Sequence, residues 1–264
     1  MVKMGEKLEK DRLERIGMSK IMKCCGKEAI IVEYNGYNDI VIMFKETGEQ
    51  IDTSYKVFKT GKIKSHFSPT VYGVGIVGLE KTKNGHDVFY NSYIRWNSML
   101  RRCFSEKEKE RSPAYKDVIC CNEWLYYKNF KNWYNENYYE IEGQRMALDK
   151  DILIKGNKIY SPNTCIFVPE RINTLFVNRN QLRGKHPVGV NYFKKGNKKY
   201  RAQCNYEDKG NITLGLFDTP ENAFYLGYKP FKEKYIKEVA DEYKYRIPVK
   251  LYNAMYQYVV EITD

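Results

Sequence analysis

The sequence lacks the long apolar stretches by which membrane-spanning and exported proteins are recognised. No run approaches the roughly 20 apolar residues that a membrane-spanning helix needs. The start of the chain has no apolar centre of the kind found in a signal peptide, and it mixes acidic residues with the cations Lys3, Lys7, Lys10, Arg12 and Arg15. We therefore expect a soluble intracellular protein with no membrane partner.

Local metal-binding patterns are also missing. No Cys-x-x-Cys pair occurs among the seven cysteines, and the three histidines, His66, His86 and His186, are too far apart to form a local metal motif. Without an export signal, the cysteines are expected to be reduced thiols that pack in the core. A structural Zn²⁺ site stays open as the less favoured alternative. It would use Cys103, Cys165 and either Cys121 or its neighbour Cys120.

Acidic residues are absent between Glu170 and Glu207, in a chain whose formal net charge is +12. This segment contains nine cations: Arg171, Arg179, Arg183, Lys185, Lys194, Lys195, Lys198, Lys199 and Arg201. A basic face that only meets water is one interpretation. The other is a surface for phosphate groups, which the absence of counter-charges favours.

The first part of the chain predicts a small β-rich module. Two β-branched runs, 29–34 and 39–44, flank the turn signal Asn35-Gly36-Tyr37-Asn38, and Thr47-Gly48 indicates a second turn. We expect three to five strands, which serve either to grip nucleic acid or only to pack. A Gly-rich passage follows, and then two helices over 87–105 and 122–139, whose aromatic residues are expected to be core.

The last part of the chain predicts three short strands over 188–193, 199–206 and 212–217, followed by a helix that Thr219 caps and Pro220 begins. The middle strand alternates. Its apolar positions Tyr200, Ala202, Cys204 and Tyr206 share one face. Its other face carries Lys199, Arg201, Gln203 and Asn205, the side-chain types that read base edges.

Residues 186–230 resemble the AP2-type DNA-binding domain. The resemblance rests on Gly189-Val190, Tyr200-Arg201-Ala202, Leu214 to Thr219, Glu221, Ala223 and Tyr228. It implies a three-stranded sheet packed on one helix, with the sheet in the major groove of double-stranded DNA. The implied contacts are Tyr192, Lys194, Lys199, Arg201, Gln203 and Asn205, and the acid-free segment adds Lys198, Arg179, Arg183 and Lys185 as further expected DNA contacts. Gly227 departs from the alanine usual in the family and is expected to loosen the helix without touching the sheet.

The preceding segment resembles the HNH nucleases of phages and mobile elements. The matching residues are Leu148 to Asp151, Gly156-Asn157, Tyr160 to Cys165, Val168-Pro169 and Ile172-Asn173. The resemblance implies a ββα-metal site with one Mg²⁺ or Mn²⁺ ion. In that site Asp149 and Asn173 bind the metal and Asn163 braces the turn between the strands. The ion stabilises charge on the phosphate and the leaving oxygen, and a base activates water.

One departure from that pattern concerns the base. Lys150 stands where the family has histidine, and an ordinary lysine, with a pKa of about 10.4, is protonated and cannot accept a proton. Burial among cations would lower its pKa, whereas Asp149 and Asp151 would raise it. Asp151 or His86 are the alternative bases.

These observations together predict a modular α+β protein of the cytoplasm of a bacterial or phage-infected cell. Its expected parts are a β-rich module (1–67), an HNH-like nuclease domain (68–177) and an AP2-like domain with a C-terminal helix (178–264). The expected function is a homing-endonuclease-like enzyme that cleaves duplex DNA. The alternatives are a nuclease-derived regulator that only binds DNA, and an inhibitor whose partner is a host or defence protein.

Overall fold

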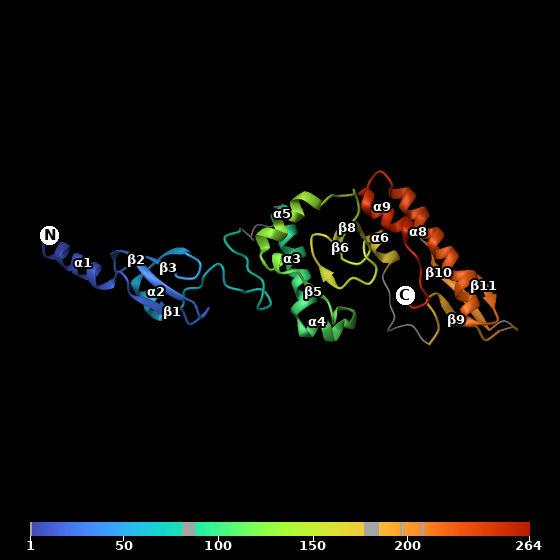
Figure 1. Ribbon diagram of the computed structural model, residues 1–264, viewed down its shortest axis with the longest axis horizontal. Helices are drawn as coiled ribbons and strands as arrows, with labels where there is room; N and C mark the ends of the chain where they lie inside the picture. Colours follow the sequence, from blue (N-terminus) through green and yellow to red (C-terminus); the bar gives the residue numbers. More distant parts are fainter. Residues whose placement is uncertain (1, 81–87, 177–184, 196, 198, 207–208) are drawn as a thin grey trace. The chain divides into compact units, whose positions relative to one another are not determined.

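A computed structural model describes residues 2–80, 88–176, 185–195, 197, 199–206 and 209–264 (Figure 1). The chain forms two compact units, Met1–Trp133 and Tyr134–Asp264. Helices and several small antiparallel sheets alternate along it, which confirms the α+β class. The finer division at residues 67 and 177 stays a prediction. Within the described part of the chain, no helix has the length and apolarity that crossing a membrane requires.

The first unit begins with the predicted β-rich module. Helix α1 (Val2–Arg15) precedes the strands β1 (Ser19–Ile21), β2 (Glu28–Gly36), β3 (Asp39–Phe44) and β4 (Gln50–Thr53), and α2 (Tyr55–Thr60) follows. The strands pair in sequence order, and β2 and β3 contain the two β-branched runs that flank the predicted turn. Their inward side chains form one core with Phe58 of α2.

The rest of this unit is helical and aromatic. It contains α3 (Val88–Phe104), α4 (Glu106–Arg111), two 3-10 turns (Pro113–Tyr115 and Asn122–Leu125), the short strand β5 (Ile119–Cys120) and most of α5 (Tyr127–Asn137). Trp96, Trp124, Tyr127 and Phe130 are completely buried, and the Trp96 indole donates to the Trp124 carbonyl at 2.6 Å. The aromatic residues are therefore core, as predicted.

The second unit carries the strand–strand–helix order that the metal-site prediction needs. Strand β6 (Met146–Asp149) pairs antiparallel with β8 (Ile166–Pro169), and α6 (Glu170–Leu175) follows directly. The register places Asp149 opposite Ile166 at the end of the ladder. Strand β7 (Ile159–Tyr160) lies between them in sequence.

The unit continues with the second predicted sheet. Strands β9 (Val190–Tyr192), β10 (Tyr200–Asn205) and β11 (Asn211–Phe217) are antiparallel, with β10 in the centre. The helical part starts at Thr219, whose side chain accepts from Asn222 N at 3.1 Å, as predicted for an N-cap. It runs through α7 (Pro220–Asn222), a π-helical turn (Ala223–Tyr228) and α8 (Lys229–Tyr243).

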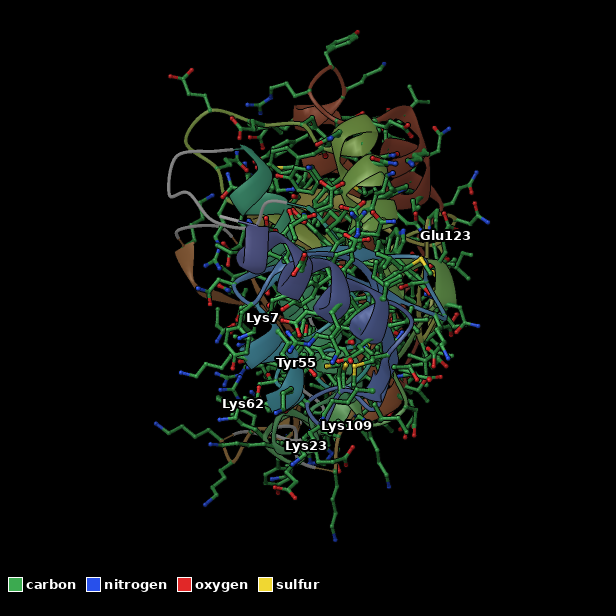
Figure 2. The ribbon with its side chains drawn as sticks, turned by 90° about the vertical axis from the view of Figure 1, so that its left-hand side faces the viewer. Lys7, Lys23, Tyr55, Lys62, Lys109 and Glu123 are labelled. Atoms are coloured by element: carbon green, nitrogen blue, oxygen red, sulfur yellow. The ribbon has the colours of Figure 1, made fainter. Side chains whose placement is uncertain are left out.

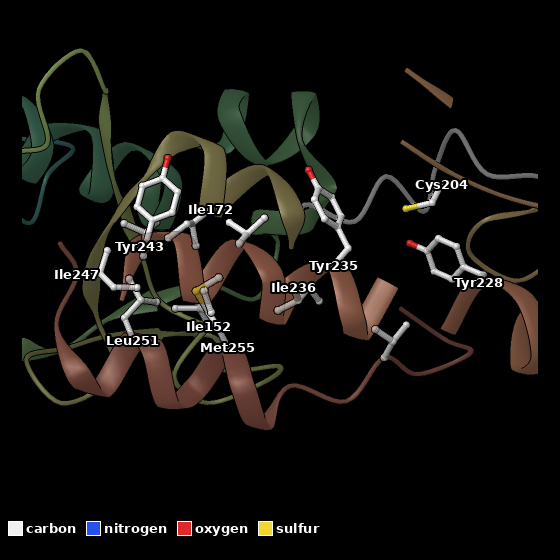
Figure 3. Close-up of a cluster of buried hydrophobic side chains, with 14 of the residues drawn as sticks. Ile152, Ile172, Cys204, Tyr228, Tyr235, Ile236, Tyr243, Ile247, Leu251 and Met255 are labelled. Atoms are coloured by element: carbon white, nitrogen blue, oxygen red, sulfur yellow. The ribbon is translucent and has the colours of Figure 1, made fainter. Parts of the chain in front are cut away.

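Helix α9 (Val249–Gln257) follows Pro248 and packs on α8. Buried side chains from α6, β9, β10, α8 and α9 make one continuous core in this unit. Figure 3 shows part of it, where Tyr243, Ile247, Leu251 and Met255 gather on α8, α9 and the turn between them.

Gly227 corrects one prediction, because it lies against the sheet rather than away from it. A Cβ atom at this position would come within 2.6 Å of Ala202 Cβ on β10 and 3.0 Å of the Phe217 ring. Glycine therefore lets the π-helical turn approach the central strand more closely than the alanine usual in the resembled family would.

Candidate nucleic-acid interface and metal centre

The central strand β10 has one buried and one open face, as its alternating sequence predicts. Ala202 and Cys204 are buried against the helix, whereas Arg201 and Gln203 are half-buried and Asn205 is exposed. A bulge in the pairing with β11 follows Ala202, so that Ala202 faces Gly215 and Gln203 faces Thr213. Bulges increase local twist and re-aim side chains.

Arg201 is held in place by two neighbours on the β9 side. Its Nε donates to Asn191 Oδ1 at 3.1 Å, and Asn191 is also its partner in the register of β9 and β10. The guanidinium carbon lies 5.4 Å from the centre of the Phe193 ring. These contacts restrain the guanidinium, a planar group whose fixed geometry allows bidentate contacts. Asn191 and Phe193 were not among the predicted site residues, although Asn191 could be found from strand pairing.

The other predicted contacts differ in how far the structure describes them. Tyr192 is half-exposed and packs edge-on against Tyr200, with ring centres 5.9 Å apart. Lys185, Lys194 and Lys199 have exposed side chains. Arg179, Arg183 and Lys198 lie outside the described residues, as does the alternative base His86.

Arg171 does not belong to the basic surface, although it is part of the acid-free segment of the sequence. Its guanidinium forms an ion pair with Glu242 of α8 and lies 5.7 Å from the centre of the Tyr243 ring. The bond to Glu242 raises the pKa of the Arg171 guanidinium further. The counter-charge comes from a residue far along the chain, which the local count of charges could not include.

Asp149 ends β6 and turns the chain out of the strand. Its Oδ1 accepts from Asp151 N at 2.9 Å and from Ile152 N at 2.7 Å. Burial of the carboxylate raises the pKa of Asp149 to about 6, and the nearby Asp151 charge acts in the same direction. A carboxylate held in such a setting is typical of functional sites, although structural turns also produce it.

Lys150 is buried and acts as a hydrogen-bond donor. Its Nζ donates to Asp151 Oδ2 and to the Asn157 carbonyl, both at 3.1 Å. The Asn157 side chain in turn donates to the carbonyls of Lys150 and Ile159. These bonds join both ends of the loop between β6 and β7. The general base, whether Lys150, Asp151 or His86, stays a prediction.

The turn before β8 is braced by other residues than Asn163. The Asn163 side chain is exposed, whereas Thr164 Oγ1 donates to the Ile159 carbonyl at 2.7 Å and contacts the Ser161 hydroxyl at 2.9 Å. Ser161, Thr164 and Asn157 therefore hold this turn together, and the bracing role of Asn163 stays a prediction.

The predicted metal ligands are of a suitable chemical type. Asp149 keeps one carboxylate oxygen that accepts none of the backbone bonds above, Asp151 is its neighbour, and Asn173 is half-buried on α6. Oxygen ligands of this kind suit Mg²⁺ and Mn²⁺.

Within the described ranges, no group of three or more His, Cys, Asp and Glu side chains is placed to hold a metal ion. That finding does not bear on a pair made of Asp149 and the amide of Asn173. The Zn²⁺ site of Cys103, Cys121 and Cys165 stays a prediction.

The chain was compared with protein-family models, with curated proteins and with solved structures, and none of them matches.

Proposed function

We propose that this protein binds duplex DNA through the open face of the sheet β9–β11. The observation that carries the proposal is the difference between the two faces of β10. One face is buried against the helix, while Arg201, Gln203 and Asn205 occupy the other. A sheet face that only meets water normally includes acidic residues, and the three strands contain none.

The chemistry of this face fits the major groove. Arginine bonds guanine at two acceptors, and glutamine and asparagine pair with adenine in a similar way. Lys185, Lys194 and Lys199 supply positive charge around it for the phosphate backbone. Arg201 is the best-placed base reader, since Asn191 and Phe193 fix its position before any DNA is bound.

The test separates base reading from phosphate binding. In a titration of a labelled duplex, Arg201→Ala should weaken binding to the preferred sequence by roughly 1–3 kcal/mol and relax discrimination at one base pair. Lys185→Ala is the matched control and should weaken all sequences alike. Identical behaviour of the two variants would remove Arg201 from base reading.

Metal-dependent cleavage of DNA is the second candidate function, and the order β6–β8–α6 favours it. Asp149 at the end of the first strand and Asn173 on the helix would hold Mg²⁺ or Mn²⁺. When bound, such an ion supplies positive charge for the phosphate and the leaving oxygen. Lys150 and Asn157 position the loop between β6 and β7, because each donates a hydrogen bond to the other's carbonyl.

Nicking of a supercoiled plasmid tests this candidate. Asp149→Ala should abolish metal-dependent nicking and leave duplex binding unchanged, whereas Lys150→His, which restores a base with a pKa of about 6.5, should maintain or raise activity. No nicking by the wild type but a gain in Lys150→His would identify a disabled nuclease. No nicking by either protein, with firm duplex binding, would favour a DNA-binding regulator.

The third candidate function is inhibition of a host or defence protein. Capture of partners at increasing salt concentration distinguishes it from DNA binding. A partner captured through DNA is lost steeply as salt rises, and an inhibitor's own protein partner is not.

A further inference from the structure

A second surface without acidic residues exists on the first unit, far in sequence from the sheet β9–β11. The segments 18–27 and 53–79 contain no Asp or Glu, and both contain several lysines. The fold brings the two segments together. Lys23 N donates to the Gly61 carbonyl at 2.8 Å, and Cys24 Sγ donates to the Ile63 carbonyl at 3.0 Å.

The meeting point is the C-terminal end of α2. Gly61 caps this helix with φ +69°, and a Cβ atom there would lie 3.3 Å from Lys23 Cγ and 3.4 Å from Lys20 Cε. The aliphatic stems of Lys20 and Lys23 therefore pack on the helix end, next to Lys59 and Lys62. After the helix, burial alternates along the chain, with Ile63 inside and Lys62 and Lys64 outside.

These residues define the N-terminal lysine surface: Lys20, Lys23, Lys59, Lys62 and Lys64. Among the described residues none of the five forms an ion pair. Figure 2 labels Lys23 and Lys62 near each other on the first unit, in agreement with the bond from Lys23 N to the carbonyl of Gly61, the residue before Lys62. Glu28 on β2 lies opposite Ile21 of β1, and its carboxylate accepts from Lys45 Nζ at 2.7 Å.

Structural roles alone do not account for five cations at this place. The negative end of a helix favours one or two lysines in its last turn, and α2 is only six residues long. The remaining ammonium groups repel one another unless an anion lies between them. Phe58 of α2 is buried in the core of its own module, and Val57 is the large aliphatic side chain that the helix exposes, whereas a helix that lies on lipid presents a broad apolar face.

We propose that the N-terminal lysine surface binds the phosphate backbone of duplex DNA, as a second contact without sequence preference. This inference rests on the proposed DNA binding of the sheet β9–β11 and adds a separate site on the other unit. Phosphate contacts position a protein on DNA and carry no sequence information, which suits a surface made of lysines. The expected consequence is tighter binding with a steeper dependence on salt.

The experiment measures duplex binding by the full chain over a range of NaCl concentrations. Lys23→Gln/Lys62→Gln should reduce the slope of log affinity against log salt by about 2, close to one per lysine. The matched control, Lys27→Gln/Lys45→Gln, removes the same charge from lysines of the same module that are paired with Glu46 and Glu28. It should leave the slope nearly unchanged.

A second variant guards against a folding effect. Lys62→Gln/Lys64→Gln leaves the Lys20 and Lys23 stems packed on Gly61, and it should change the slope by the same amount. The proposal is overturned if both surface variants keep the wild-type slope, or if the control changes it equally.

Two further arms separate this proposal from the one on which it rests. If Arg201→Ala weakens binding while the surface variants do not, the sheet β9–β11 binds DNA and the lysine surface does not. If the surface variants also change the slope in the Arg201→Ala background, the lysine surface contacts DNA independently of Arg201. The full chain is also tested on phosphatidylserine vesicles. If it binds them, and if the surface variants lose this binding while their duplex binding is unchanged, the surface binds lipid and the proposal is overturned.

Discussion

The two larger sheets of the molecule, β1–β4 and β9–β11, differ in the charges of their outward faces. On the first, Lys45 pairs with Glu28 at 2.7 Å, and Lys27 pairs with Glu46 at 3.3 Å beside the strand ends. On the second, no strand contains an acidic residue, and Arg201 is fixed by an amide and a ring instead of a carboxylate.

The difference shows how a solvated face is distinguished from a binding face in a lysine-rich protein. Both sheets bury one side, so burial and alternation do not separate them. The presence of counter-charges does. By the same criterion, the binding surface of the first unit is not its sheet. It is the end of α2, where lysines without counter-charges lie together.

The largest expected effect breaks the second sheet and leaves the first intact. Gly189 has φ +70°, and a Cβ atom there would lie 1.9 Å from the Tyr228 ring. Gly189→Ala should therefore destabilise the second unit by about 3 kcal/mol or more. Hydrogen exchange should rise in β9–β11 and stay unchanged in β1–β4.

Gly210→Ala is the control for that substitution. It has a similar backbone conformation, φ +67°, but open space around the position. Only the conformational penalty of about 1–2 kcal/mol remains. An equal loss of stability in both variants would show that the close approach of Gly189 to Tyr228 does not add to the cost of the substitution.

The next effect concerns one carboxylate in each unit, Asp149 and Glu28, whose pKa values move in opposite directions. Burial raises the pKa of Asp149 to about 6, whereas the hydrogen bond from Lys45 lowers the pKa of Glu28. A raised acid pKa means that the folded state binds the proton more tightly than the unfolded state. The contribution of Asp149 to the free energy of unfolding is therefore full below about pH 4, and it is lost as the pH rises to about 6.

Asp149→Asn removes this charge and keeps an oxygen acceptor for Asp151 N and Ile152 N. In the presence of a chelator, the variant should be more stable than wild type at pH 7, on the order of 2 kcal/mol, and equal to it at pH 4. Glu28→Gln should behave in the opposite sense, less stable than wild type at pH 7. Chemical denaturation at both pH values measures this, and a variant Asp149→Asn that is less stable at pH 7 would contradict the assignment.

A smaller effect compares single lysines on the two sheets. Lys194 is exposed in the hairpin between β9 and β10, and Lys45 follows β3 with Glu28 as its partner. In duplex titrations, Lys194→Gln should reduce the magnitude of the salt slope by about 1, because one phosphate contact is lost. Lys45→Gln should leave it unchanged. The comparison of the two sheets would be wrong if Lys45→Gln had the larger effect.

The smallest effect tests the correction made for Arg171. Because its charge is paired with Glu242, Arg171→Gln should not alter the salt slope of DNA binding. The loss of a partly exposed ion pair should lower the free energy of unfolding by about 1 kcal/mol or less. A clear decrease in slope would return Arg171 to the DNA-binding surface.

Local features of the sequence predicted several elements of the fold. β-branched runs on either side of a turn signal located β2 and β3, period-two alternation located β10, and the Thr219-Pro220 pair located the start of a helix. These signals act within a few residues, which is the range over which backbone propensity and capping are decided. The outward positions of Arg201 and Gln203 follow from the same alternation.

Contacts between distant segments could not be predicted in this way. The pairing of Arg171 with Glu242 and the packing of Gly227 on Ala202 depend on how α8 and its π-helical turn lie on their neighbours. The N-terminal lysine surface was missed because its two segments meet only in the fold. Its signal, two acid-free stretches, is present in the sequence.

Acetylation footprinting of lysines in the full chain, with and without a saturating duplex, tests the central claim most directly. If duplex DNA lies on the open face of β9–β11, then Lys185, Lys194 and Lys199, which have exposed side chains, should react more slowly in the complex. Lys45 should react at the rate of the free protein. Bound duplex with no protection at Lys185, Lys194 and Lys199, or with the same protection at Lys45, would contradict the claim.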